Sequence, residues 1–114
     1  MENDYLKPIP DDRIICLKIS KTYNRRDPND IRLDLYDCVR KYWVMDINRA
    51  KTANRVLAVV DGVIIAEYEP ESWGHIEHKG RRRCYFEGKE IVPSSYIGKQ
   101  VTYRGQNPVK YINM

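Results

Sequence analysis

Four aromatic residues and a run of three arginines have side chains that suit the binding of a nucleic acid. Aromatic rings hold unstacked bases face to face, and arginines bind phosphate oxygens. Trp43 is expected at a break between two helices and Trp73 in a loop, where both rings can line a cleft. The alternative is that one or both rings fill the core of a small domain. The aromatic residues are Trp43, Trp73, Tyr85 and Tyr96, and the arginines are Arg81, Arg82 and Arg83.

The positive charge of the chain is concentrated in its C-terminal part. The 114 residues include 20 Lys and Arg and 16 Asp and Glu, which gives a formal net charge of +4. Residues 74–114 hold 8 basic and 3 acidic residues, whereas residues 58–73 hold 4 acidic residues and no basic one. A basic segment attracts phosphate through counterion release, but a charge of this size is also typical of an ordinary solvated surface.

Two histidines and a cysteine carry side chains that bind zinc. They are His75, His78 and Cys84. A structural zinc site needs four ligands, usually in two closely spaced pairs, and the sequence offers no second pair. The sequence therefore predicts neither a metal nor another cofactor, and it places the histidines at the rim of a loop.

Asp61 and the later Glu87-Gly88-Lys89 have the residue types of a metal-dependent nuclease. In such a site the carboxylates hold Mg²⁺ and the lysine stabilises charge. Asp61 is needed by a predicted hairpin turn, however, and Gly88 is expected to interrupt the strand. Tyr96-Ile97-Gly98 spells half of the GIY-YIG nuclease signature, but the other half and its Arg and Glu partners are missing. No catalytic residue is assigned, and binding is favoured over catalysis.

The first half of the chain is expected to form one strand and two helices. Residues 14–19 are a nearly continuous apolar run of strand length. Asp27 and Pro28 are expected to open a helix whose apolar face extends to Tyr42 and places Cys38 in the core. Asp46 is expected to cap a short second helix that ends near residue 53.

Strands dominate the predicted structure after residue 55. Residues 55–60 and 63–68 are expected to form a hairpin around Asp61-Gly62. Pro70 is expected to end that hairpin and begin a loop over residues 70–80, and Gly88 to turn a strand over 82–87. Pro93-Ser94-Ser95 is expected to begin a short helical turn around Tyr96, followed by strands at 100–103 and 109–112. Because no long helix separates these strands, the sequence predicts an α+β fold with a mainly antiparallel, curled or barrel-like sheet and two packed helices.

The chain is expected to be one domain over residues 13–114, preceded by an irregular lead-in over residues 1–12. No apolar run reaches the roughly 18 to 20 residues of a membrane span, and the first residues lack the features of a signal peptide. Three widely spaced cysteines suit buried thiols in a reducing compartment. These features predict a cytoplasmic protein that does not enter a membrane.

Four stretches of the chain share their order and spacing with a known family: WVMDINRAKTA at 43–53, VLAVVDGVI at 56–64, RCYFEG at 83–88 and QNPVKYIN at 106–113. They resemble a small bacterial domain that occurs alone or beside nuclease domains of the GIY-YIG class. The order of elements is also similar to that of the PUA-like group, which includes the ASCH, EVE and YTH domains. PUA-like domains commonly bind RNA or modified bases in a cleft, so the resemblance implies binding.

Together these observations predict a module that binds RNA or DNA and recognises an unpaired or modified base. Trp43, Trp73 and Asn107 are expected to hold the base. The alternative is a protein–protein interaction module that uses the same aromatic patch, because aromatic residues and arginine are also enriched at protein interfaces. A metal-dependent nuclease is the third hypothesis. The residues expected to contact the flanking phosphates are Arg49, Arg81, Arg82, Arg83 and Lys110.

Overall fold

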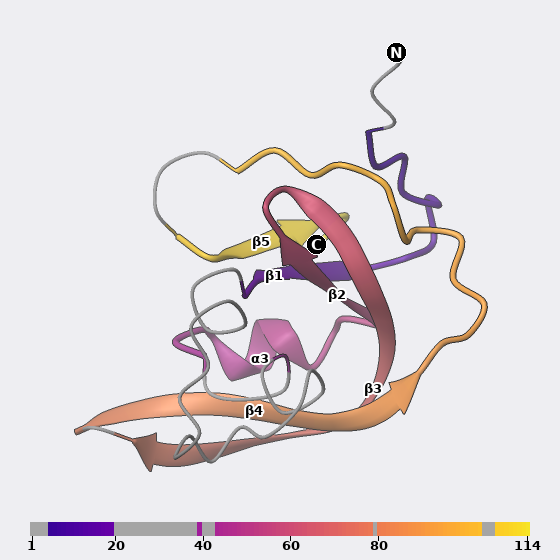
Figure 1. The fold of residues 1–114 in the computed structure, drawn as a ribbon. Coiled ribbons are helices and arrows are strands. Elements are labelled where there is room, and N and C mark those ends of the chain that lie inside the picture. Colours follow the sequence, from indigo (N-terminus) through magenta and orange to yellow (C-terminus); the bar gives the residue numbers. More distant parts are fainter. Residues whose placement is uncertain (1–4, 20–38, 40–42, 79, 104–106) are drawn as a thin grey trace.

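A five-stranded sheet forms the centre of the molecule (Figure 1). The computed structural model describes residues 5–19, 39, 43–78, 80–103 and 107–114. The strands lie in the order β4-β3-β2-β1-β5. Their bounds are Ile14–Lys18 for β1, Arg55–Val60 for β2, Val63–His78 for β3, Arg81–Glu90 for β4 and Val109–Ile112 for β5, and the short helix α3 is Ile47–Ala50. The expected helix over residues 28–42, with Cys38, falls almost entirely outside the described residues.

The sheet is mixed and open. Strands β1 and β2 run parallel, whereas the β1–β5, β2–β3 and β3–β4 pairs are antiparallel. The parallel pair is possible because residues 19–54 join β1 to β2, a connection long enough to cross over and return in the same direction. Strands β4 and β5 are the two edges, so a sheet-dominated fold is confirmed, but the described strands do not close into a barrel. The expectation of two packed helices is supported for α3 alone in the described part of the chain.

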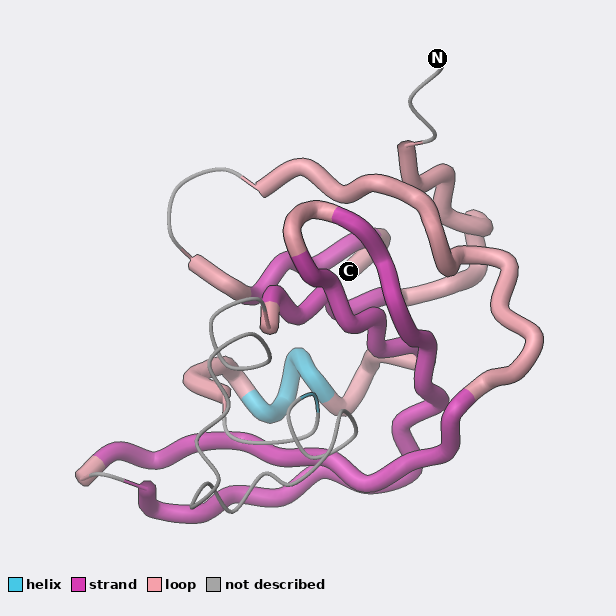
Figure 2. Tube along the Cα trace, viewed as in Figure 1, coloured by secondary structure: helices cyan, strands magenta, loops and turns pink. Residues whose placement is uncertain are grey.

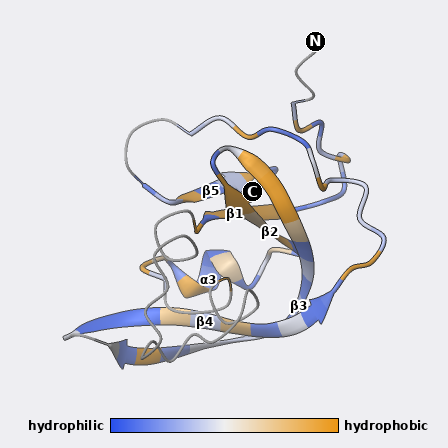
Figure 3. Cartoon of the chain, viewed as in Figure 1, coloured by the Kyte–Doolittle hydropathy of each residue, from blue (hydrophilic) through white to orange (hydrophobic). Residues whose placement is uncertain are grey.

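Both faces of the central strands are buried. Ile15 and Leu17 of β1 belong to a cluster that also contains Trp43 and Ala50, while Ile14 and Cys16 belong to a second cluster on the other face. This two-sided burial explains why β1 reads as a continuous apolar run rather than an alternating one. Figure 3 shows the apolar colouring concentrated on β1, β2 and the start of β3. The described helix is too short and too polar to cross a membrane.

Two local predictions are confirmed in detail. Asp61 and Gly62 have φ angles of 51° and 81°, the positive values that a type I′ turn requires between β2 and β3. Asp46 is the N-cap of α3, and its side chain accepts a hydrogen bond from the backbone N–H of Asn48 at 2.9 Å.

Strands β3 and β4 are much longer than the sequence suggested. Pro70 does not end β3, because the pairing register shifts between Pro70 and Ser72 and the strand continues to His78. A bulge accommodates a residue that has no N–H to donate. Gly88 does not turn β4 either. It lies opposite Pro70, where an added Cβ would be 2.2 Å from the carbonyl oxygen of Glu69.

The segment between β4 and β5 contains less regular structure than expected. No helix forms around Tyr96 among the described residues. Bends at Pro93 and Ser95 are followed by a single hydrogen-bonded turn, in which the N–H of Lys99 donates to the carbonyl of Tyr96 at 3.1 Å. Residues 100–103 are not a strand, since Gln100 makes only isolated bridges to Tyr5 and Val63. Figure 2 shows this segment as a loop. It covers one face of the sheet, where Tyr96 and Val101 are buried against Leu57 and Ile64.

Candidate nucleic-acid interface

Beyond Trp73 and Phe86, strands β3 and β4 continue as a two-stranded arm, residues 74–78 and 81–85 (Figure 1). The Trp73 and Phe86 rings pack at its base, with centroids 5.2 Å apart. From His75 to Arg82 every side chain that the structure describes is exposed. The molecule measures 43 × 30 × 30 Å, which fits a compact body with one projecting hairpin.

Strand alternation divides the three arginines between the two faces of the arm. The inner face carries Cys84 and Phe86, both buried, and Arg82 lies on this face opposite Glu77. Arg81 and Arg83 lie on the outer face together with Tyr85. The arginines are therefore neighbours in the sequence, but they do not point to one place.

The inner face of the arm is anchored to the segment that precedes α3. Trp43 and Cys84 exchange two backbone hydrogen bonds, of 2.8 and 2.6 Å, and the Cys84 thiol donates to the carbonyl of Met45 at 3.2 Å. Burial raises the pKa of the Cys84 thiol, partly opposed by this contact with Met45. The thiol is therefore a packing group rather than a nucleophile.

A glycine makes room for an aromatic ring on the outer face. Tyr85 is opposite Gly74 in the register, and a Cβ added to Gly74 would lie 2.6 Å from the Tyr85 Cζ. Next to this pair, Arg83 faces Ile76, which is 42% exposed. The Nε of Arg83 is enclosed and has no hydrogen-bond partner among the described residues.

The four aromatic residues singled out in the sequence do not form one exposed surface. Trp43 is 8% exposed, and its indole N–H donates to the carbonyl of Val39 at 2.7 Å. Trp73 is half-buried and lies on β3 rather than in a loop. Tyr96 is buried, and its hydroxyl donates to Asp12 at 2.7 Å. The alternative, that one or both tryptophans fill the core, is therefore correct for Trp43, and Tyr96 is buried as well.

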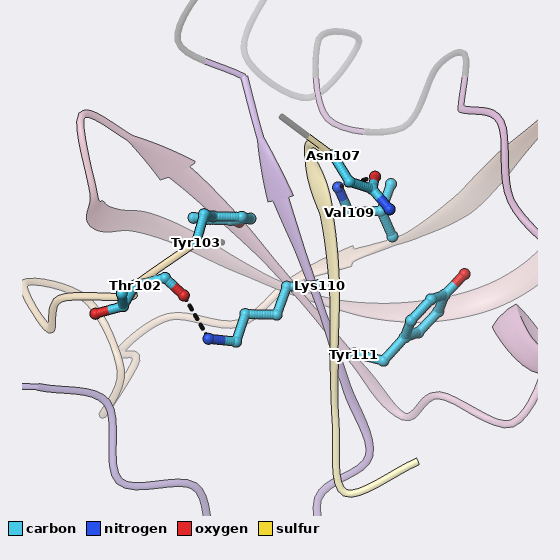
Figure 4. A pocket seen from close by; sticks show the side chains of 6 residues that line it. All are labelled: Thr102, Tyr103, Asn107, Val109, Lys110 and Tyr111. Atoms are coloured by element: carbon cyan, nitrogen blue, oxygen red, sulfur yellow. Dashed lines mark hydrogen bonds between the residues drawn. The ribbon is translucent and has the colours of Figure 1, made fainter. Parts of the chain in front are cut away.

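A hollow follows strand β5 (Figure 4). Its volume is about 590 Å³. Lys110 and Tyr111 extend from opposite sides of β5. The ammonium group of Lys110 donates to the carbonyl of Thr102, and Asn107 accepts a hydrogen bond from the N–H of Val109 at 3.0 Å. The lining residues are Thr102, Tyr103, Asn107, Val109, Lys110 and Tyr111.

Arg49 lies beside this hollow rather than beside the arm. Its guanidinium carbon is 3.9 Å from the centroid of the Tyr111 ring, and Nη2 donates to the carbonyl of Met114 at 3.4 Å. Burial raises the pKa of Tyr111, and the charge of Arg49 opposes that rise. The sequence reasoning did not single out Tyr111. The signal available for it was the alternation of apolar and polar residues along 109–112.

A buried ionic cluster around Glu67 is fully paired and serves the fold. Glu67 is 4% exposed, forms an ion pair with Arg55 at 3.1 Å, and accepts a hydrogen bond from the Ser94 hydroxyl at 2.5 Å. These contacts fasten the loop after β4 to the sheet. A buried carboxylate with this many partners has a structural explanation that requires no ligand.

The residue sets considered for metal chemistry are not assembled. The described part of the chain contains no group of three or more His, Cys, Asp or Glu side chains placed to hold a metal ion. His75 and Cys84 are opposite each other in the register, but they are a pair without a described third ligand. Asp61 lies at the start of β3, whereas Glu87 pairs with Ser72 about ten residues further along it.

The predicted site residues thus fall into three places. The arm carries Arg81, Arg82 and Arg83, the β5 hollow carries Asn107 and Lys110 with Arg49 beside it, and the core takes Trp43 and part of Trp73. Neither a family model, nor a curated protein, nor a solved structure matches the chain.

Proposed function

We propose that this protein is a nucleic-acid-binding module whose main phosphate contacts are made by the arm. The observation that carries the proposal is the position of Arg81 and Arg82, both exposed, and of Arg83, half-buried, at the end of a hairpin that projects from the body. The guanidinium group is planar, always charged and able to bind phosphate oxygens in pairs. A projecting hairpin also lets these groups approach a phosphate backbone without collision with the described residues of the body.

The cations near β5 are second to the arm. The Lys110 ammonium group already donates to the carbonyl of Thr102, and the Arg49 guanidinium lies on the Tyr111 ring. Both retain donors for a phosphate, but each would exchange an existing contact for a new one. The net gain from such an exchange is smaller than that from a cation in water.

Recognition of an unpaired or modified base falls, in this proposal, to the rings that keep some exposed surface. Trp73 and Tyr111 are half-buried and meet that condition. Trp43 does not, because its ring is in the core and its indole N–H is bonded within the protein. Stacking adds about 1–3 kcal/mol per base where a ring face is free.

The test is fluorescence anisotropy with short single-stranded and duplex DNA and RNA at several salt concentrations. Two to three phosphate contacts to a duplex predict that affinity falls about 12- to 40-fold between 50 and 200 mM salt, a slope of about −1.8 to −2.7. The triple variant R81A/R82A/R83A should lose most of that slope.

A charge-matched control separates a local contact from general attraction. Lys7, Lys51 and Lys89 are exposed, and the weak ion pair of Lys89 with Glu71 spans 3.6 Å. The variant K7A/K51A/K89A therefore removes the same charge with little effect on the fold. The proposal fails if both triple variants lose affinity equally. It also fails if the unaltered protein binds none of the four nucleic acids more tightly than about 100 μM at low salt.

A further inference from the structure

We infer that the arm enters the major groove of a B-form DNA duplex with its outer face, the one that carries Arg81 and Arg83, toward the DNA. This inference rests on the proposed function and specifies both its ligand and the contacting surface. It follows from the length of the arm, from the distribution of charge between its two faces, and from the absence of exposed rings on its described residues.

The length of the arm matches the groove. Cys84 is hydrogen-bonded to Trp43, so the free part of the arm is residues 76–78 paired with residues 81–83, three residues in each strand. At about 3.3 Å per residue this is about 10 Å. The major groove of B-DNA is about 8.5 Å deep and about 12 Å wide, and it admits a two-stranded ribbon. The two strands, about 4.8 Å apart, therefore fit within the width of the groove with the outer face toward the base pairs.

The charge of the arm favours its outer face. On that face Arg81 and Arg83 are opposite His78 and Ile76, and the nearest acidic position on the same face is Glu87, near the base. On the inner face Arg82 is directly opposite Glu77, so that the two charges offset each other. Among the described residues, a phosphate backbone thus meets two arginines without an acidic residue opposite them on one face and an Arg–Glu pair on the other.

Arg83 supplies a second observation that points to a ligand on this face. Its Nε is enclosed without a hydrogen-bond partner in the described part of the chain. A buried donor left unsatisfied costs about 1–3 kcal/mol. A phosphate or base-edge acceptor that reorients this guanidinium group would remove that cost, which adds to the affinity on the outer face and not on the inner one.

The same arm is poorly suited to single strands and to double-stranded RNA. Its described side chains from His75 to Arg82 include no Trp, Tyr or Phe on which an unstacked base could lie. The major groove of A-form RNA is too deep and narrow for side chains to read. B-form duplex DNA remains as the form whose groove accepts the arm.

The experiment compares the double variant R81A/R83A with the single variant R82A on one duplex DNA. Two outer-face phosphate contacts predict that R81A/R83A reduces the salt slope by about 1.8. R82A should change the slope by less than 0.5. R81K/R83K should restore most of the slope, since a lysine also binds phosphate. Arg81 and Arg82 are exposed, so melting curves of all variants check that the fold is kept.

Ligand form and groove are tested on the unaltered protein. Duplex DNA should bind at least tenfold more tightly than duplex RNA or single-stranded DNA of the same sequence. Methyl green, which occupies the major groove, should displace the protein, and netropsin, which occupies the minor groove, should not.

The outcomes of these experiments distinguish the groove inference from nucleic-acid binding in general. Equal binding of duplex and single-stranded DNA, competition by netropsin alone, or an R82A effect as large as that of R81A/R83A would overturn the groove inference. In each of these cases nucleic-acid binding itself would stand. Failure of every nucleic acid to bind would overturn both, and the exposed Ile76 on the arm would then favour a protein partner.

Discussion

Replacement of Gly88 by alanine should be among the most damaging small substitutions in this protein. Gly88 lies opposite Pro70 at the point where the β3–β4 register shifts. An alanine Cβ there would lie 2.2 Å from the carbonyl oxygen of Glu69, and 3.0 Å from both the Glu69 carbonyl carbon and the Pro70 Cα. All three are backbone atoms, so no side chain can rotate away to make room.

The size of the expected stability loss follows from how far the two backbones must move apart. To restore even a tight 3.0 Å contact from 2.2 Å, the two backbones must separate locally by about 0.8 Å. Overpacking of this kind costs about 1–3 kcal/mol, and a weakened hydrogen bond between the strands adds about 0.5–1.5 kcal/mol. The expected loss is about 2–4 kcal/mol, which is a large fraction of the total stability of a small domain.

Urea unfolding measures this loss. A cost of about 3 kcal/mol lowers the midpoint by about 2 M if the m-value is about 1.5 kcal/mol per M. The matched control is Gly80→Ala, where an added Cβ meets nothing within 4 Å and the change costs only the strain of φ +76°, roughly 1 kcal/mol. If Gly88→Ala lowers the free energy of unfolding by no more than Gly80→Ala does, the strands have room for a Cβ at residue 88, and the predicted backbone clash is refuted.

Four further predictions test other parts of the structure. Gly62→Val should cost well over 1 kcal/mol in the same unfolding assay, because a β-branched residue does not tolerate the φ of 81° found in this turn. Burial raises the pKa of the Cys16 thiol to about 12. Below about pH 9 the folded and the unfolded chain both hold this proton, and above it only the unfolded chain releases it, so the free energy of unfolding should fall from about pH 9 to pH 12. Cys16→Ala should reduce the fall measured between about pH 9 and 10. Trp43→Ala should cost about 3–5 kcal/mol and Trp73→Ala clearly less, because the first ring is buried and the second is half-buried. Added EDTA should leave the melting temperature unchanged, and elemental analysis should find less than one zinc per chain.

The features that were predicted correctly depend on a few neighbouring residues. Asp61-Gly62 between two β-branched runs specifies its turn through the positive φ angles that both residues must adopt. Asp46 caps α3 through a contact with Asn48, two residues away. In both cases the interaction that selects the structure lies within the window that a reader of the sequence can inspect.

The features that were missed depend on contacts between distant segments. Pro70 and Gly88 are both turn formers by local preference, and each was expected to end a strand. In the structure they face each other across β3 and β4. The bulge tolerates the missing N–H of the proline, and the missing Cβ of the glycine admits the neighbouring backbone. Each residue explains the other only after the pairing is known.

The directions of the arginines in the candidate site also depend on contacts between distant segments. As a sequence, Arg81, Arg82 and Arg83 are one basic cluster. The expected strand over 82–87 separates Arg82 from Arg83, but Arg81 was expected in the preceding loop, where it could point to either face. Extension of β4 to Arg81 imposes alternation, which places Arg82 opposite Glu77 and leaves Arg81 and Arg83 on the other face. The quantity that matters for binding is therefore the charge of each face rather than the charge of the run. That charge could be assigned only once both strands of the arm, and the register between them, were known.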